Sequence, residues 1–276
     1  MITIYPRSGT AKADHIQIED FFSKKLSLCT VSDFLDNTLT NILVSKLTTK
    51  LPEEELTIRM DDGYFYPFPY STIHDRNTFD RHHTYFRSSV HFSEHYSDFI
   101  EQLQKKLEDF FRIQLTPLLT DDGLYFSRFN TRILFHQKNG IDIHCENAFI
   151  PQLNPKLTHW LENKLDLRNA LSFYLVLQQP ESGGELILYN QEWDNVQIEI
   201  KHESYEDRHD ISGGMFRKKG IKDIHYDKIS PQRGEAVIFR AAQIWHGIHK
   251  IEGNTNRITI GCFIGKGKDE KYYFWA

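Results

Sequence analysis

From about residue 124 the chain is a series of short apolar runs separated by turn residues, and this pattern limits the folds open to it. The turn signals are Asn139-Gly140, Ser182-Gly183-Gly184, Ser212-Gly213-Gly214 and Gly253-Asn254. The apolar runs are 132–136, 141–144, 171–177, 185–189, 196–200, 236–240 and 257–264. Many short strands with such turns are typical of a β-barrel or a double-sheet jelly roll. A helix-like insertion at about 155–167 interrupts the runs.

The first 123 residues are mixed, and their periodicity predicts helices at 31–49 and at about 93–113. The second helix has one broad apolar stripe, made of Phe99, Ile100, Leu103, Leu107, Phe110 and Phe111. Such a stripe braces a sheet from outside. Because no linker divides the chain, we predict a single domain, 1–276. It is mainly β with flanking helices: a helical N-terminal layer, 1–123, packs on a double-stranded β-helix core (jelly-roll, cupin-like), 124–276.

Composition excludes several classes of protein. The net charge is −5 and no basic stripe is evident, which argues against a nucleic-acid partner. Three cysteines without a CxxC motif give neither a disulfide framework nor a thiolate zinc site. No apolar run approaches the roughly 20 residues that span a bilayer, and the first residues show no signal pattern. We therefore expect a cytoplasmic protein with a small-molecule partner and no membrane contact.

An aromatic segment at 64–70 contains two prolines, which disfavour a central strand there. It is either a wall or lid over a pocket, or an edge segment that packs on the core, and packing is the commoner use of such a run. Tyr66 and Phe68 are its candidates for the substrate pocket.

Two histidines and a glutamate are the candidate metal ligands. In a strand, residues i and i+2 share a face, so His144 and Glu146 project together. A lone H-x-E is weak evidence, but His246 follows about 100 residues later with an arginine, Arg257, beyond it. If Gly253-Asn254 is a two-residue hairpin loop, His246 pairs with Gly261, Ile248 with Thr259 and Lys250 with Arg257. A three-residue loop would reverse that parity.

Two imidazoles and one carboxylate on one face match the facial triad of non-haem iron(II) oxygenases. Three further positions on iron then accept a chelating 2-oxo acid and dioxygen. A dicarboxylate co-substrate needs a fixed cation at its far end, and guanidinium binds carboxylate through two hydrogen bonds. The sequence therefore predicts Fe(II) held by His144, Glu146 and His246, with 2-oxoglutarate at Arg257 and Thr259 and O2 as oxidant.

The C-terminal half resembles the 2-oxoglutarate/iron(II) dioxygenase superfamily. It is most similar to the carrier-protein-independent iron halogenases of hapalindole-type alkaloid biosynthesis. The matching stretches are 144–149, 171–174, 180–186, Glu192-Trp193, 246–263 and 271–275. The resemblance implies iron at His144 and His246, 2-oxoglutarate at Arg257, a co-substrate contact at Arg132, a serine near the iron at Ser172, and a pocket position at Ile141.

The resemblance fails at one decisive position. The halogenases carry glycine where this chain has Glu146, and that glycine opens a site for chloride on iron. A carboxylate occupies the site here, so we expect hydroxylation of an unactivated C–H bond, with 2-oxoglutarate converted to succinate and CO2. The substrate is a small molecule, an amino-acid derivative or natural-product intermediate. The alternatives are a halogenase whose glutamate swings off the iron and a non-catalytic jelly-roll binding protein.

Several nearby residues have simpler interpretations. Asp142 has the strand parity of His144 but stands on the wrong side of the motif for a ligand. His136 and His249 are predicted to be structural, and Cys145 to be a small buried residue facing away from the metal. A charged segment at 201–229 is a solvated excursion or, alternatively, a lid.

Overall fold

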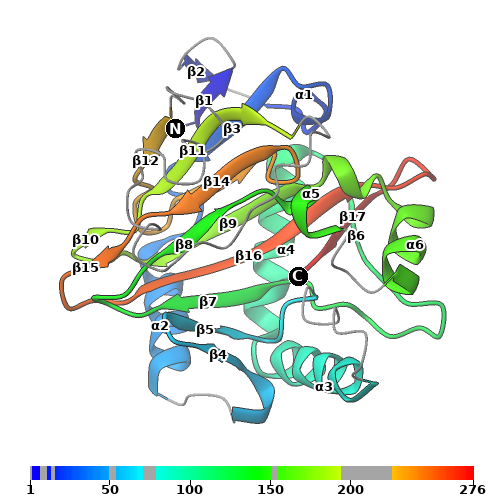
Figure 1. Ribbon diagram of the computed structural model, residues 1–276, viewed down its shortest axis with the longest axis horizontal. Helices are drawn as coiled ribbons and strands as arrows, with labels where there is room; N and C mark the ends of the chain where they lie inside the picture. Colours follow the sequence, from blue (N-terminus) through cyan, green and yellow to red (C-terminus); the bar gives the residue numbers. More distant parts are fainter. Residues whose placement is uncertain are drawn as a thin grey trace, which may run out of the picture.

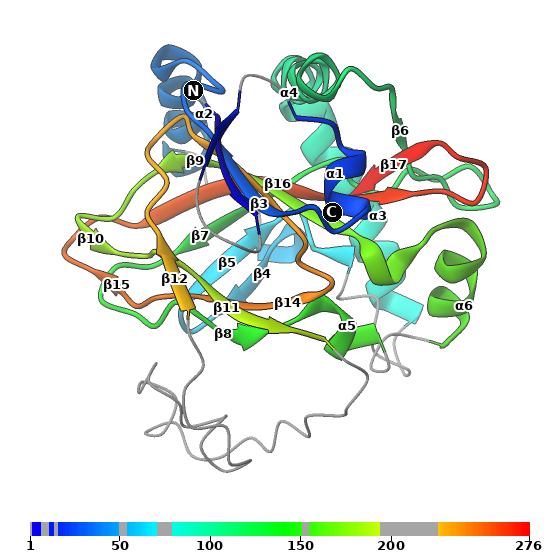
Figure 2. The same ribbon diagram turned by 90° about the horizontal axis from the view of Figure 1, so that it is seen from above.

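The computed structural model describes residues 2–6, 11–13, 16–49, 54–70, 79–150, 155–193 and 226–276. Its described parts form three layers, which Figure 2 shows from above: helices, a large sheet and a small sheet. Helices α2 (Asn37–Thr49) and α4 (Ser97–Phe111) cover one face of the large sheet, and the small sheet lies over the other face (Figure 1). This is the predicted jelly-roll core with a helical layer, and the fold class is confirmed.

The large sheet runs in the order β2-β1-β3-β13-β9-β16-β7-β5-β4; β17 also pairs with β16, and β6 pairs with β17. Its strands are β1 (Ile2–Pro6), β2 (Ala11–Ala13), β3 (Leu26–Val31), β4 (Ile58–Met60), β5 (Gly63–Tyr66), β6 (Leu115–Pro117), β7 (Asn130–Leu134), β9 (Leu171–Gln178), β13 (Ala236–Phe239), β16 (Arg257–Lys266) and β17 (Tyr272–Trp275). The small sheet has the order β12-β11-β14-β8, from β8 (Ile141–His144), β11 (Leu186–Glu192), β12 (Tyr226–Ile229) and β14 (Ile244–Ile248). The separate pair β10 (Ser182–Gly183) and β15 (Ile251–Glu252) lies where the chain passes between the sheets.

The helices are α1 (Glu19–Phe22), α2 (Asn37–Thr49), α3 (Phe79–His95), α4 (Ser97–Phe111), α5 (Glu146–Phe149) and α6 (Pro155–Lys164), with 3-10 turns η1 (Glu54–Leu56) and η4 (Leu167–Asn169). The apolar stripe predicted for α4 is confirmed, because Ile100, Leu103, Leu107 and Phe111 are buried against the sheet. No described helix is long and apolar enough to cross a membrane.

Two helix predictions were wrong in their bounds. The helix expected at 31–49 begins only at Asn37, because the carboxylate of Asp36 accepts hydrogen bonds from the backbone N–H groups of Thr38 and Leu39 and so caps it. The helix expected at 93–113 begins at Ser97, and residues 93–95 belong to α3, which the sequence did not predict. The helix-like insertion at 155–167 is confirmed as α6 and η4.

Strand β16 has a different role on each face. Ile258, Ile260, Cys262 and Ile264 belong to the core cluster on the helix side. Alternation along the strand turns Arg257, Thr259 and Gly261 toward the small sheet. One face of β16 therefore packs in the main hydrophobic core, and the other face lines the polar space between the two sheets.

The predicted hairpin between His246 and Arg257 was wrong. Strand β14 pairs with β11 and β8, whereas β16 pairs with β7, β9 and β17, so the two strands lie in different sheets. Residues 249–256 cross from one sheet to the other, and β15 pairs with β10 on the way. The pairs His246–Gly261 and Lys250–Arg257 therefore do not form.

The segment at 64–70 was only partly predicted. Strand β5 lies between β7 and β4, so it is not an edge, and Pro67 and Pro69 both follow the strand. Tyr66 faces the helices, where its ring packs on Phe92 and its hydroxyl bonds His91. Packing therefore explains this residue, and its predicted place in the substrate pocket was wrong.

The charged segment at 201–229 was predicted to be an excursion, but residues 226–229 form β12 and extend the small sheet. The remainder of that segment, with the run at 196–200 and the turn signal at 212–214, lies outside the described residues.

Candidate metal centre

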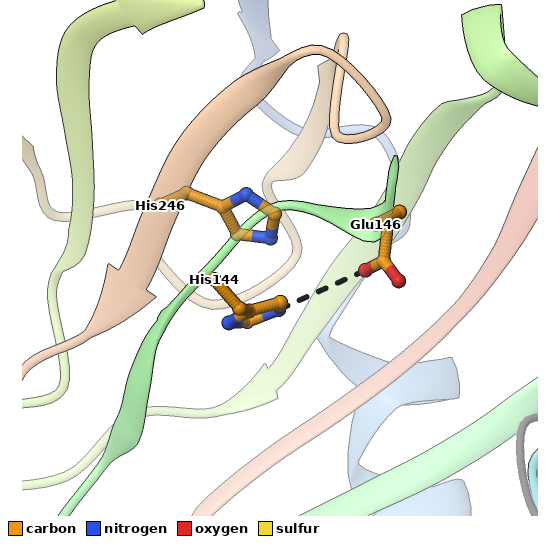
Figure 3. Close-up of side chains that lie close together, drawn as sticks. All are labelled: His144, Glu146 and His246. Carbon is orange, nitrogen blue, oxygen red and sulfur yellow. Dashed lines mark ion pairs between the residues drawn. The ribbon is translucent and has the colours of Figure 1, made fainter. Parts of the chain in front are cut away.

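Three side chains converge on one point between the sheets (Figure 3). His144 ends β8, Glu146 begins α5, and the extended backbone of Cys145 between them turns both side chains the same way. His246 lies directly opposite His144 on β14. The candidate ligand atoms all lie within 4.8 Å of one another. His144 Nε2 and Glu146 Oε1 are 3.7 Å apart, and the two imidazole centroids are separated by 4.2 Å.

Backbone carbonyls fix both imidazoles. His144 Nδ1 lies 2.6 Å from the carbonyl oxygen of Asp142, and His246 Nδ1 lies 2.8 Å from that of Ile244. Since a carbonyl only accepts, each Nδ1 carries the proton and each Nε2 keeps its lone pair toward the centre. The ring of Phe239 packs edge-on against His246, with centroids 4.8 Å apart. The rings are therefore oriented for metal binding before any metal arrives.

A register shift in the β8–β14 pair determines how Ile141 and Asp142 face, which strand alternation alone does not predict. His246 pairs with His144 and Ile248 with Ile141, so three steps on β8 match two on β14. Ile141 therefore lies across from Ile248 on β14, and the side chain of Asp142 is exposed. Asp142 contributes its carbonyl to the site rather than its carboxylate.

Burial determines the protonation of the three residues. It lowers the pKa of His144 to about 4 and the pKa of His246 well below its usual value, with the Arg132 charge adding to both shifts. Burial raises the pKa of Glu146 to about 7, and Arg132 opposes this shift. Two neutral imidazoles and a carboxylate are a donor set suited to a divalent cation.

The inner face of the large sheet carries two arginines. Arg132 on β7 pairs directly with Thr259 on β16, and Arg257 lies two residues further along the same face. Arg257 is 3% exposed, and its Nη2 has no hydrogen-bond partner among the described residues. A buried guanidinium with an unmet donor fits a carboxylate, so the residues present suit a dicarboxylate co-substrate.

Two neighbours shape the position of Arg257. Its guanidinium carbon lies 5.3 Å from the ring centroid of Tyr174 on β9. A Cβ added to Gly184 would stand 3.0 Å from Arg257 Cδ and 2.8 Å from Pro180, and Gly184 has a φ of +70°. The glycine pair noted as a turn signal thus also allows the backbone to approach the arginine closely.

Of the remaining predicted site residues, Ser172 lies on the inner face of the large sheet and Phe68 lies elsewhere. Ser172 lies opposite Phe239 and Phe263 on the neighbouring strands, on the face shared with Tyr174. Phe68 packs against a second core cluster that contains Trp275. These positions leave their predicted roles as hypotheses.

Phe65 was not predicted from the sequence, although its ring centroid lies 4.5 Å from the guanidinium carbon of Arg132. Phe65 pairs with Arg132 across β5 and β7, while Tyr66 faces the helices. Alternation from Tyr64 onward would have separated the two faces, had the segment been read as a strand. Tyr174 and Phe239 were also missed, because nothing in their local sequence marks them.

The residues given simpler interpretations have other partners. Cys145 is buried, and its thiol donates to the carbonyl of Ala242 at 2.9 Å. His136 Nδ1 lies 2.9 Å from the side-chain oxygen of Asn256, and His249 Nδ1 lies 3.0 Å from Glu185 Oε2. Both histidines therefore have partners outside the candidate metal centre.

A match to a known protein family shows which proteins this chain is related to. The family model described as carrier-protein-independent halogenase WelO5 matches residues 12–276. The chain belongs to this family. The carrier-protein-independent halogenase family includes the helical N-terminal layer as well as the jelly roll, so the match extends well beyond the region where the sequence resemblance was evident.

Solved structures place this member of the halogenase family in a wider fold group. An N-substituted L-amino acid dioxygenase from Burkholderia ambifaria AMMD is 13% identical and has a TM-score of 0.61. Its complex with α-ketoglutarate is 12% identical and has a TM-score of 0.64. Each alignment covers 100% of this chain and 98% of the other, which shows a shared fold. No curated protein sequence matches. The chain therefore shares the fold of these dioxygenases, as the sequence predicted.

Proposed function

We propose that this chain hydroxylates an unactivated C–H bond of a small molecule, an amino-acid derivative or natural-product intermediate. The observation that carries the proposal is the convergence of His144, Glu146 and His246 opposite a buried arginine, Arg257, whose Nη2 lacks a partner. One face supplies a metal-binding set, and the other supplies a cation for the far end of a dicarboxylate. Bound iron(II), with 2-oxoglutarate and dioxygen, supplies the oxidising chemistry.

The protein's part is to hold and orient. His144, Glu146 and His246 would hold the metal, and the two backbone carbonyls behind the imidazoles keep each Nε2 directed at it. Arg257 and Thr259 would bind the distal carboxylate of 2-oxoglutarate. Arg132, which pairs with Thr259 across the strands, would add a further contact to the co-substrate, and Ser172 is a candidate hydrogen-bond donor near the reacting atoms.

Glu146 separates hydroxylation from the chlorination that the family name describes. A carboxylate ligand fills the coordination position that chloride would need, and its negative charge disfavours a second anion there. The buried, raised-pKa carboxylate gains a counter-charge from the metal, which favours its remaining bound. Chlorination by the native protein is the second candidate function, and family membership is the observation in its favour.

The proposal is tested in anaerobic solution. Iron(II) and 2-oxoglutarate added together should give the visible charge-transfer absorption of the chelate. Absence of that absorption in folded protein would rule out the proposed function and favour a non-catalytic binding protein. Glu146→Ala should abolish hydroxylation, and Glu146→Gly with added chloride tests whether an opened position admits the halide. Chlorinated product from the native protein would establish the second candidate.

A further inference from the structure

A short turn, 240–244, leads from β13 into β14 shortly before His246. The carbonyl of Arg240 closes this turn by accepting the backbone N–H groups of Gln243 and Ile244, each at 3.0 Å. The carbonyl of Ile244 accepts a hydrogen bond from His246 Nδ1 at 2.8 Å. The direction of the His246 ring therefore depends on where the 240–244 turn lies.

The same turn holds the segment that carries Glu146. The backbone N–H of Glu146 donates to the carbonyl of Ala241 at 3.3 Å. The thiol of Cys145, the preceding residue, donates to the carbonyl of Ala242 at 2.9 Å. Two of the three candidate metal ligands are thus attached to one turn, His246 through its ring and Glu146 through its backbone.

The end of β11 contacts this turn at two points. Arg240 Nη1 lies 2.6 Å from Glu192 Oε1, and Glu192 lies opposite Ile244 on β14. The backbone N–H of Trp193 donates to the carbonyl of Gln243 at 2.7 Å. One contact uses the Arg240 side chain, and the other uses only the backbone.

Regular strand pairing does not position this end of the small sheet. Between Leu188 and Glu192, β11 advances four residues. The residues that pair with them on β14, His246 and Ile244, are only two apart. The ladder is therefore interrupted beside His246, and the ion pair of Arg240 with Glu192 lies where the pairing resumes.

Net stability does not account well for this ion pair. Arg240 is buried, and its Nη2 has no hydrogen-bond partner among the described residues. A buried ion pair recovers its desolvation cost only when its remaining donors are satisfied, and apolar side chains often replace such a pair without loss of stability. The pair does fix the turn relative to β11, because a charge-assisted hydrogen bond is short and directional.

We infer that Arg240, through its contact with Glu192, is a positioning residue for the metal centre. It fixes the 240–244 turn, and the carbonyls of that turn direct the His246 ring and hold the backbone of Glu146. The inference rests on the proposed function, in which these residues hold the metal. Neither Arg240 nor Glu192 belongs to the candidate ligand set.

The first test removes the ion pair and measures metal binding. Arg240→Met/Glu192→Leu eliminates both charges, so no buried charge loses its partner and the native circular dichroism should be retained. Cobalt(II), titrated without 2-oxoglutarate, should bind about ten- to hundredfold more weakly than to native protein, with altered visible d–d absorption. An affinity within about threefold of native, with an unchanged spectrum, would overturn the inference.

A conservative variant guards against a general loss of folding. Arg240→Lys keeps a cation that can reach Glu192 but loses the planar set of donors. It should therefore bind cobalt(II) more tightly than Arg240→Met does and more weakly than native protein does. Equal affinities of Arg240→Lys and Arg240→Met would overturn the inference.

The second measurement reports on the imidazole of His246 in metal-free protein. Nitrogen NMR of isotope-labelled histidine should show the Nδ1–H tautomer in native protein, because Nδ1 must donate to a carbonyl. The signals of His246 are those that His246→Gln lacks. In Arg240→Met/Glu192→Leu they should change to a mixture of both tautomers, because the carbonyl of Ile244 is no longer fixed. A retained Nδ1–H tautomer would overturn the inference, whatever the metal affinity.

An exposed ion pair of similar length is the matched control. Arg87 Nη2 lies 2.7 Å from Glu55 Oε2, and both side chains are exposed. Arg87→Met/Glu55→Leu makes the same exchange between α3 and η1, and it should leave cobalt(II) affinity and the His246 tautomer at their native values. An equal loss in this control would show that the effect is not specific to Arg240 and would overturn the inference.

Failure of the proposed function gives a different result. If native protein binds neither cobalt(II) nor iron(II), the metal centre is wrong, and the inference falls with it. If native protein gives the visible absorption with iron(II) and 2-oxoglutarate, while removal of the ion pair changes neither metal affinity nor tautomer, the proposed function stands and the inference alone is overturned.

Discussion

The two sheets face the same interior with different regularity. The small sheet presents His144 and His246 from β8 and β14, a pair whose register shifts beside the ligands. The large sheet presents Arg132 and Arg257 from β7 and β16, a pair with continuous register over five residues on each strand. The candidate metal ligands are thus aimed by a local irregularity and by backbone carbonyls, whereas the spacing of the arginines follows from regular pairing braced by helices.

The largest expected effect comes from the small sheet. His246→Ala should lower catalysis by on the order of a thousandfold, because a metal ligand is lost from a set of three. Iron content of the purified variant and substrate-dependent succinate release measure this. His249→Ala is the control, since His249 pairs with Glu185 outside the metal centre, and it should keep activity within about threefold. Full iron binding by His246→Ala would contradict the assignment.

Stability should depend on the large sheet. Ile260 is fully buried between β16 and the helices, so Ile260→Ala should lower the free energy of unfolding by about 2–4 kcal/mol. Urea denaturation followed by circular dichroism measures this. Ile42→Ala, at a position 48% exposed on α2, should change it by less than about 1 kcal/mol. Loss of iron affinity in folded Ile260→Ala protein would contradict the view that the large sheet determines stability while the small sheet determines metal binding.

A smaller effect separates charge from geometry on the large sheet. Arg257→Lys keeps the positive charge but loses the two-pronged donor, so 2-oxoglutarate affinity should fall about tenfold. Titration of the visible absorption with 2-oxoglutarate gives the affinity, and iron content should stay at the native level. An unchanged affinity would mean that the distal carboxylate binds elsewhere.

The smallest effect lies far from the interior, where α1 meets the end of the large sheet. Glu19 accepts hydrogen bonds from the hydroxyl of Tyr272 and from Lys266 Nζ, the latter at 3.2 Å. The hydrogen bond from Tyr272 lowers the pKa of Glu19 in the folded state, Lys266 adds to this shift, and burial opposes it. This stabilisation is present above the unfolded-state pKa and is lost as pH falls through the folded one.

Glu19→Gln should therefore cost less than about 1 kcal/mol near neutral pH, since both side chains are partly exposed, and should cost nothing below about pH 3. Denaturation at the two pH values measures the difference. A cost that persists in acid would show that the contact is not ionic.

Many of the helices and strands could be predicted from the sequence, because they depend on local patterns of apolar residues. The apolar stripe of α4, the strands from Ile141 and from Leu171, and the insertion at α6 all follow from periodicity. The candidate ligands were found from residue chemistry and spacing, and the geometry brings them together.

What could not be predicted depended on contacts between distant segments. The predicted hairpin assumed that strands close in sequence share a sheet, whereas 249–256 passes between sheets and β14 finds its partners in β11 and β8. Tyr66 was taken for a pocket residue because its face depends on a pairing with β7 that local sequence does not reveal. The register shift in β8 likewise exists only against β14.

The short pairing of β10 with β15 joins the two segments that pass between the sheets at one edge. A Cβ at Gly184, next to β10, would stand 3.0 Å from Arg257 Cδ, and β15 follows the strand that carries His246. The separation between the metal ligands and the distal cation is thereby tied to backbone hydrogen bonds rather than to flexible side chains. In the proposed enzyme this fixed separation should match a dicarboxylate of one length. We expect tighter binding of the five-carbon 2-oxoglutarate than of the shorter oxaloacetate or the longer 2-oxoadipate.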